Sequence, residues 1–131
     1  YWEARKLIPF SLGNIAVTTA GKLPAKKIFH GVVIDWYKGI FPSTNIIQQV
    51  VHNCLEKAHQ YGFSSIAFPL LGTGAAGFPV QEALEITLKQ IISDLSQENQ
   101  NILVAIVAIY NINDGREILK QLNLKNFLER I

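Results

Sequence analysis

A six-residue run at Ile66–Leu71 is apolar at every position, and it constrains the fold more than any other feature of the sequence. A strand with one face in water alternates apolar and polar residues. A strand that is apolar on both faces is typical of the interior of a parallel sheet. We therefore expect Ile66–Leu71 to form a central strand that helices cover on each side.

Two amphipathic helical patterns flank this strand in the sequence. The first follows a cap at Ser43 or Thr44 and ends near Gly62, which suits a left-handed C-terminal cap. The second begins near Pro79, a residue suited to the first turn of a helix. Apolar residues recur in both at the spacing of one buried helix face. They are Ile46, Ile47, Val50, Val51, Cys54, Leu55 and Ala58 in the first pattern, and Val80, Ala83, Leu84, Thr87, Leu88, Ile91, Ile92 and Leu95 in the second.

Further strands are expected on either side of these helices. Ile15–Thr18 alternates and ends in a turn at Ala20-Gly21, whereas Lys27–Ile34 and Ile102–Ile109 are rich in β-branched residues. Strand and helix alternate from Lys27 onward, so the sequence predicts an α/β fold with a largely parallel sheet. Short helical segments are expected at Tyr1–Leu7, Glu117–Leu122 and Asn126–Ile131.

Composition indicates a single globular domain over residues 1–131, because 49% of the 131 residues are hydrophobic and 17% are charged. The single cysteine, Cys54, lies on an apolar helix face, so we expect a packed thiol in a reducing compartment. No stretch reaches the roughly 18 apolar residues of a membrane span. These features predict a chain with no membrane association, in the cytoplasm or, in a eukaryote, the nucleus.

The charged residues are interspersed, and the formal net charge is only +2. Strong nonspecific binding to nucleic acid needs a clustered basic face. The longest basic run is Lys26-Lys27, for which a solvated edge is the expected role. His30, His52 and His59 lie far from any glycine-rich loop in the sequence, so structural or solvated roles are expected for them. No metal site is predicted.

A glycine-rich loop, Gly72-Thr73-Gly74-Ala75-Ala76-Gly77, directly follows the apolar strand and precedes the second helix. Ligands of open α/β sheets bind beyond the carboxyl ends of the strands. Three glycines in six residues remove side chains that would keep a phosphate from the backbone, and the next helix adds its positive dipole end. A tight structural turn usually needs one glycine, so phosphate binding is the favoured interpretation.

Two familiar phosphate loops do not fit this context. The spacing Gly72-x-Gly74-x-x-Gly77 matches the dinucleotide fingerprint, but no acidic residue stands at the tip of the next strand, which ends in Tyr110-Asn111. An ATP-type loop would continue with Lys and then Ser or Thr, whereas Phe78-Pro79 follows Gly77 here.

Three motifs in the same order resemble the macro domain family: Leu23–His30, Ser65–Gly74 with Gly77-Phe78-Pro79, and Val104–Asn111. The resemblance spans roughly Gly13 to Asn111. It implies a three-layer α/β/α fold with a mixed, largely parallel sheet. It also implies that the chain binds ADP-ribose or an ADP-ribosylated protein, without a further cofactor.

The resemblance also implies the ligand-binding residues. The glycine loop and its flanks would wrap the diphosphate and the distal parts of the ligand, while Tyr110 would lie against the adenine with Asn111 nearby. The expected site is Leu71, Gly72, Thr73, Gly74, Ala75, Ala76, Gly77, Phe78, Tyr110 and Asn111.

The first half of a macro domain, with its asparagine-rich segment and first glycine-rich loop, has no counterpart in these residues. In the family's sheet, a strand from that half lies between the strands that match Lys27–Ile34 and Ser65–Leu71. Either upstream residues have been lost, with other domains of a longer chain as candidate partners, or the two strands pair directly. We expect the first.

No catalytic group is identified among the residues present. Ala75 and Ala76 occupy the part of the loop where some hydrolytic members carry an aspartate, and alanine cannot act as acid, base or nucleophile. The leading hypothesis is therefore a binding module. The alternatives are an ADP-ribosyl hydrolase or deacetylase with catalytic residues upstream of Tyr1, and a macro-like regulatory or interaction domain that binds no ligand.

Overall fold

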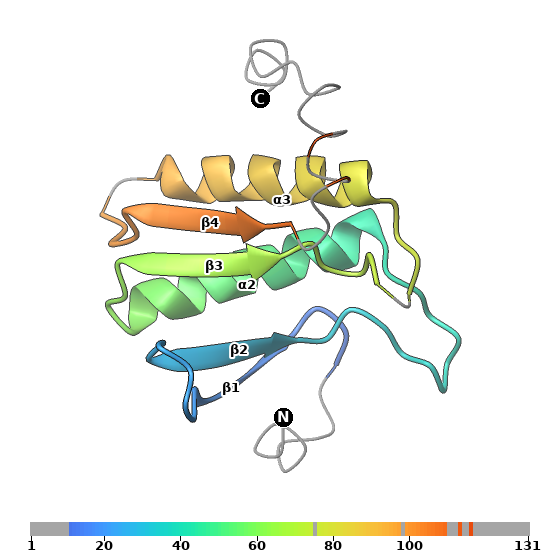
Figure 1. Ribbon diagram of the computed structural model, residues 1–131, viewed down its shortest axis with the longest axis horizontal. Coiled ribbons are helices and arrows are strands. Elements are labelled where there is room, and N and C mark those ends of the chain that lie inside the picture. The colour runs from blue at the N-terminus through green and yellow to red at the C-terminus, as the bar shows by residue number, and fades with distance from the viewer. Residues whose placement is uncertain (1–10, 75, 98, 110–112, 114–115, 117–131) are drawn as a thin grey trace.

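The computed structural model describes residues 11–74, 76–97, 99–109, 113 and 116. Four strands and two helices follow in the order β1 (Ile15–Thr19), β2 (Lys27–Gly31), α2 (Thr44–Gln60), β3 (Ser65–Pro69), α3 (Val80–Leu95) and β4 (Val104–Ala108). Strand and helix alternate from β2 onward, so the predicted α/β class is confirmed (Figure 1). The helical segments expected at Tyr1–Leu7, Glu117–Leu122 and Asn126–Ile131 lie outside the described residues.

Helix α2 begins and ends as its sequence predicts. The Ser43 hydroxyl accepts a hydrogen bond from the Ile46 amide at 3.3 Å, which identifies Ser43 as the N-cap. At the other end Gly62 has a φ of +74°, the left-handed conformation expected there. The Phe63 amide donates to the Ala58 carbonyl at 3.0 Å and the Gly62 amide to the His59 carbonyl at 2.9 Å, so the last carbonyls of the helix are bound.

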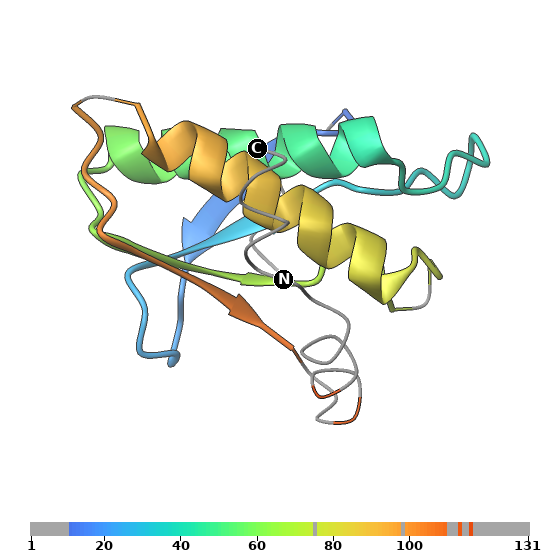
Figure 2. The same cartoon turned by 90° about the horizontal axis from the view of Figure 1, so that it is seen from above.

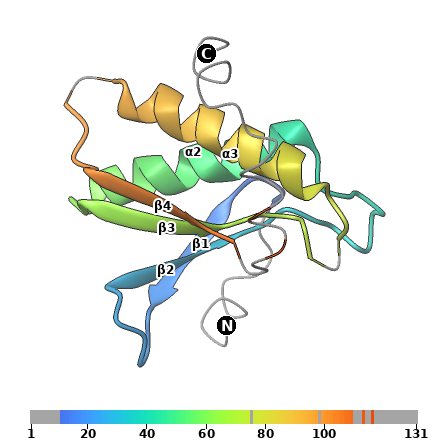
Figure 3. The ribbon, with the colours of Figure 1, turned by 45° about the horizontal axis from the view of Figure 1, so that its top comes forward.

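Helix α3 starts one residue later than its pattern indicates. Pro79 is the N-cap, with extended backbone angles, and the first turn begins at Val80. The predicted core face of α2 is found except at Ile46, which is only partly buried. In α3 the face differs more, because Ile86 is buried although it was not predicted, and four predicted residues are only partly buried: Val80, Leu88, Ile92 and Leu95. The two helices lie side by side on one side of the strands (Figures 2 and 3). Their buried residues are Ile47, Val50, Val51, Cys54, Leu55 and Ala58 in α2, and Ala83, Leu84, Ile86, Thr87 and Ile91 in α3.

The strands form two separate sheets of two strands each. β1 and β2 pair antiparallel, with Val17 opposite Phe29, and β3 and β4 pair parallel, with Ala67 opposite Ile106. β2 and β3 are not paired with each other, so the alternative in which they close up and pair directly is wrong. A mixed arrangement is therefore confirmed, with an interruption in the middle of the strand layer (Figure 1).

Helix α2 joins the two sheets, since it contacts β1, β2 and β3. An aromatic cluster also links β2 to the start of β3. The ring of Phe29 lies 6.2 Å from that of Tyr61 and 6.5 Å from that of Phe63, and the Tyr61 and Phe63 rings stack at 5.2 Å. The two sheets are therefore held in one body without a shared backbone ladder.

Both faces of the β3–β4 sheet were expected to be covered by helices. One face, with Ile66 and Phe68 of β3, packs against the core formed with the helices. On the other face Ala67 is exposed, and so are Val104 and Ile106, at 50% and 54% of their surface. Among the described residues, no helix covers this second face. The strands are also shorter than predicted, because β2 ends at Gly31 and β4 spans only Val104–Ala108.

Candidate functional site

The glycine loop leaves the carboxyl end of β3 and leads into α3, as its position in the sequence predicts (Figure 1). Internal hydrogen bonds give the loop its shape. The Phe78 amide donates to the Gly72 carbonyl at 2.8 Å, and the Gly77 amide donates to the Gly74 carbonyl at 3.0 Å. These two hydrogen bonds fix the backbone conformation of the loop in the absence of a ligand.

Two glycines of the loop adopt a backbone conformation that other residues rarely take. Gly72 has a φ of +77° and Gly77 a φ of +75°. A Cβ on Gly72 would also lie 2.9 Å from the Pro42 Cβ, so the backbone passes closely against the segment that precedes α2. Gly74 differs, because its φ is not positive and a Cβ there would meet nothing within 4 Å. The loop is thus anchored at Gly72 and open at Gly74 and Gly77.

The amides of the loop divide into used and available groups. The Gly77 amide donates to the Gly74 carbonyl, and the Thr73 hydroxyl donates to the Leu70 carbonyl at 2.7 Å. The amides of Gly72, Gly74 and Ala76 have no hydrogen-bond partner among the residues that the structure describes. Successive backbone N–H groups of this kind, next to a helix N-terminus, suit an anion.

The remaining predicted site residues fall into two groups. Leu71 and Phe78 are partly buried and pack against the hydrophobic core, so they anchor the two ends of the loop to it. Ala75, Tyr110 and Asn111 lie outside the described residues, and their predicted roles stay predictions.

Sequence reasoning did not identify the segment that lies beside the glycine loop. The sequence predicts only a loop at Gly39–Pro42, yet Pro42 lies against Gly72, and Trp36 is exposed next to Phe41. The signal for this segment was present as three aromatic residues within six positions around Gly39.

The three histidines make contacts within the fold. His52 lies 3.0 Å from Asp94 and 3.3 Å from Glu56, and His59 accepts a hydrogen bond from the Asn101 amide at 3.2 Å. His30 lies 2.9 Å from the Thr18 hydroxyl across the β1–β2 pair. In the described ranges, no group of His, Cys, Asp and Glu side chains could hold a metal ion.

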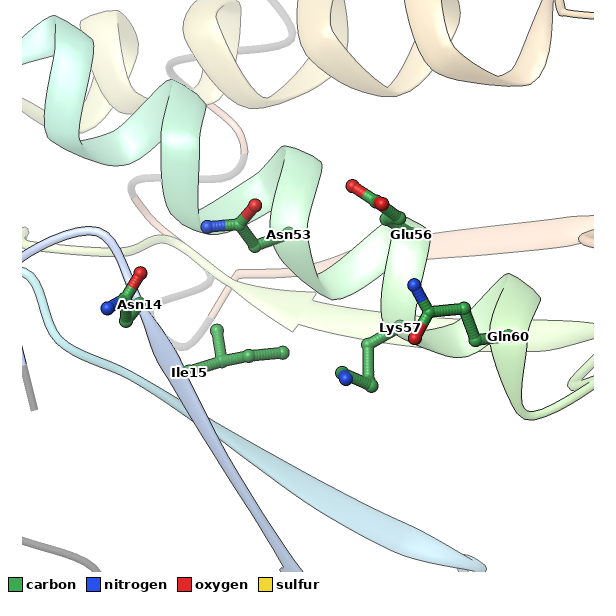
Figure 4. A pocket seen from close by; sticks show the side chains of 6 residues that line it. All are labelled: Asn14, Ile15, Asn53, Glu56, Lys57 and Gln60. Atoms are coloured by element: carbon green, nitrogen blue, oxygen red, sulfur yellow. The ribbon is translucent and has the colours of Figure 1, made fainter.

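A separate cleft of about 370 Å³ lies between β1 and α2 (Figure 4). Asn53 is held at its wall by a hydrogen bond from its side-chain amide to the Gly13 carbonyl at 2.8 Å. No residue of the glycine loop lines this cleft, so it is not part of the predicted site. Its lining residues are Asn14, Ile15, Asn53, Glu56, Lys57 and Gln60. None of the helices described here is long and apolar enough to cross a membrane.

The sequence of the chain is similar to those of known proteins that contain macro domains. A macro domain-containing protein from Acinetobacter sp. (strain ED45-25) is 34% identical over 114 residues, which cover 78% of this chain and 62% of the relative. An O-acetyl-ADP-ribose deacetylase from Enterobacter cloacae is 34% identical over 84 residues, 64% of this chain and 47% of that enzyme.

Solved structures agree with these relatives. A point mutant of the Oceanobacillus iheyensis macrodomain, solved with ADPR, superposes with a TM-score of 0.74 at 32% identity over 92% of this chain and 62% of that one. The same macrodomain with ADP gives a TM-score of 0.76 at 29% identity, over 98% of this chain and 65% of that one. This chain therefore spans less than two thirds of the length of each of these proteins.

These likenesses confirm the predicted macro-like α/β fold. The macro domain family model matches residues 2–87, well over half of the chain, and so includes β1, β2, α2, β3 and the glycine loop. The chain belongs to the macro domain family.

Proposed function

We propose that this chain binds ADP-ribose, free or attached to a protein, through the glycine loop at the carboxyl end of β3. The observation that carries the proposal is the loop's geometry: three amides without partners among the described residues, and open space beside Gly74 and Gly77. A diphosphate supplies the acceptor oxygens that such amides need. The macrodomain solved with ADPR supports the choice of ligand.

The test is isothermal titration of the folded chain with ADP-ribose, with AMP and NAD for comparison. We expect micromolar affinity, about −8 kcal/mol. AMP should bind much more weakly, because it lacks the second phosphate. No binding by a cooperatively folded chain would contradict the proposal and would favour a macro-like interaction domain.

Gly74→Asp is the sharpest variant for the loop. The variant places a carboxylate beside the proposed diphosphate, so we expect binding to be abolished. The fold should survive, because the φ of Gly74 is not positive and a Cβ there meets nothing within 4 Å. Gly77→Asp should also abolish binding, but Gly77 has a positive φ, so that variant adds backbone strain to the effect of the charge.

Gly21→Asp is the matched control for Gly77→Asp. Gly21 has a φ of +59° and open space around it, but it lies in the β1–β2 turn, away from the loop. It should lose similar stability and keep full affinity. ADP-ribose affinity that is unchanged in the Gly74→Asp protein would refute the loop assignment.

A second candidate is hydrolysis of an ADP-ribose ester or linkage, since relatives with 34% identity include an O-acetyl-ADP-ribose deacetylase. The alignment covers only 47% of that enzyme, and no catalytic group is identified in the described loop. Incubation of the chain with O-acetyl-ADP-ribose and measurement of released acetate separates the two functions. A binding module gives no acetate above the rate without protein.

A further inference from the structure

The segment between β2 and α2 gathers exposed aromatic residues next to the glycine loop. Trp36 is 63% exposed, Phe41 is 55% exposed and Tyr37 is fully exposed. With Ile40, these residues make up four of the nine exposed large hydrophobic residues of the described chain. Isolated exposed apolar residues are ordinary, but a cluster of this kind on one short turn marks a contact surface.

The turn that carries them is built to hold its shape. Asp35 and Ile40 exchange two backbone hydrogen bonds, each 2.9 Å long, and the Asp35 carboxylate accepts the Lys38 amide at 3.1 Å. Gly39, with a φ of +65°, closes the turn. The Trp36 and Phe41 rings meet edge to face, with centroids 5.8 Å apart. A surface that is ordered in advance loses little entropy when a ligand binds.

Pro42 fixes this turn against the glycine loop. It follows Phe41 directly, and its Cβ would lie 2.9 Å from a Cβ placed on Gly72. The turn continues from β2, so it stands on the side of the glycine loop away from β4 (Figure 1). The turn that carries Trp36 and Tyr37 is therefore joined to the glycine loop through the Pro42–Gly72 approach.

The chemistry of the turn selects among the groups that could stack there. Tryptophan and tyrosine faces stack on nucleobases, and each stacked base contributes on the order of 1–3 kcal/mol. Lys38 adds a positive charge at the tip of the same turn, which favours a neutral base that carries phosphates over a cationic ring such as nicotinamide. The fitting group is the adenine of a second nucleotide unit with its diphosphate.

We propose that Trp36 and Tyr37, with Phe41 behind Trp36 and Lys38 beside them, form a second nucleotide site next to the glycine loop. The chain then binds two linked ADP-ribose units more tightly than one. This inference rests on the proposed binding of ADP-ribose to the loop, but it concerns a different surface.

The experiment compares ADP-ribose with a chemically defined ADP-ribose dimer by isothermal titration. We expect the wild-type chain to bind the dimer about tenfold more tightly, which corresponds to the lower half of the stacking range. Trp36→Ala should remove that advantage and leave the affinity for single ADP-ribose unchanged. Leu23→Ala is the control, because Leu23 is 59% exposed at the β1–β2 turn and should keep the tenfold difference.

Fluorescence supplies an independent readout of the stack. The dimer should quench tryptophan emission more than ADP-ribose does, and Trp36→Phe should abolish the difference while it keeps an aromatic ring for stacking. NAD should bind no more tightly than ADP-ribose.

Each other outcome contradicts the inference in a distinct way. Equal wild-type affinities for dimer and monomer would overturn the second site and leave the proposed function intact. Equal losses for both ligands in Trp36→Ala would assign Trp36 to the first site instead. Tighter binding of NAD through Trp36 would overturn the choice of adenine. A folded wild-type chain that binds none of the ligands would overturn the second site together with the proposed function.

Discussion

Cys54 lies on the buried face of α2, 5% exposed, among the residues that form the core. The sequence predicted a packed thiol there, and the structure confirms it. Burial raises the pKa of this thiol from its ordinary 9.0 to about 12, because the thiolate would lose its hydration in the core. The residue is therefore a packing element and a poor nucleophile near neutral pH.

This pKa predicts a loss of stability at high pH. Above about pH 9 the unfolded chain releases the thiol proton while the folded chain keeps it, so the free energy of unfolding falls as pH rises through this range. Between pH 8 and pH 10 the free energy of unfolding of the wild-type chain should fall by about 1.4 kcal/mol more than that of Cys54→Ala, in which the other groups titrate as before. Urea unfolding at both pH values measures the difference, and equal losses would show that Cys54 ionises in the folded state.

At the scale of elements, β2 approaches α2 closely at Gly31. A Cβ on Gly31 would collide with the Val50 Cγ1, and Val50 is itself only 1% exposed. The absence of a side chain at Gly31 is what lets the strand lie against the helix. This contact holds the end of β2 against Val50, in the N-terminal half of α2.

Gly31→Ala tests this approach. We expect it to lower the free energy of unfolding by about 1–3 kcal/mol, since the new methyl group overpacks the contact. Val50→Ala removes the Cγ1 atom that the new methyl group would meet. In the Val50→Ala protein, Gly31→Ala should therefore lower the free energy of unfolding by at least about 1 kcal/mol less than it does in the wild type. Urea unfolding of the four proteins completes the cycle. Strictly additive losses would mean that the strand and helix can move apart at no cost.

For the whole molecule, the notable feature is an uneven covering of the strands. Both helices pack on one side (Figures 2 and 3), while the other side of β3–β4 exposes Val104 and Ile106. Among the residues that the structure describes, no strand pairs with β2 and β3 between the two sheets, and α2 contacts both strands.

Neighbouring residues of β4 test the uneven covering. Ile106 is 54% exposed, whereas Val107 packs against the core on the opposite face. Ile106→Ser should change the free energy of unfolding by less than about 0.5 kcal/mol, and Val107→Ser should cost about 2 kcal/mol. Thermal or urea unfolding measures both. A large loss in Ile106→Ser would show that this face is covered in the folded protein.

Much of this fold could be predicted because its causes are local. The Ser43 cap, the buried face of α2 and the positive φ of Gly62 each follow from a few adjacent residues. The glycine loop could also be placed, because an apolar strand, three glycines and a helix start follow one another directly in the sequence. The family resemblance added the ligand, which spacing alone did not identify.

Other features depended on residues far apart in the chain, and these only the tertiary structure decided. Strand pairing is set by which backbone edges come together in space, so the sequence left open whether β2 and β3 pair, and the structure leaves them apart. The turn that carries Trp36, Tyr37 and Phe41 lies beside the glycine loop because Pro42 packs against Gly72, which no local pattern predicts. The sequence by itself determined the main helices and strands and the position of the glycine loop, because periodicity and backbone conformation act within one segment. The pairing of the sheets and the neighbour of the loop depend on packing between segments, which no local pattern records.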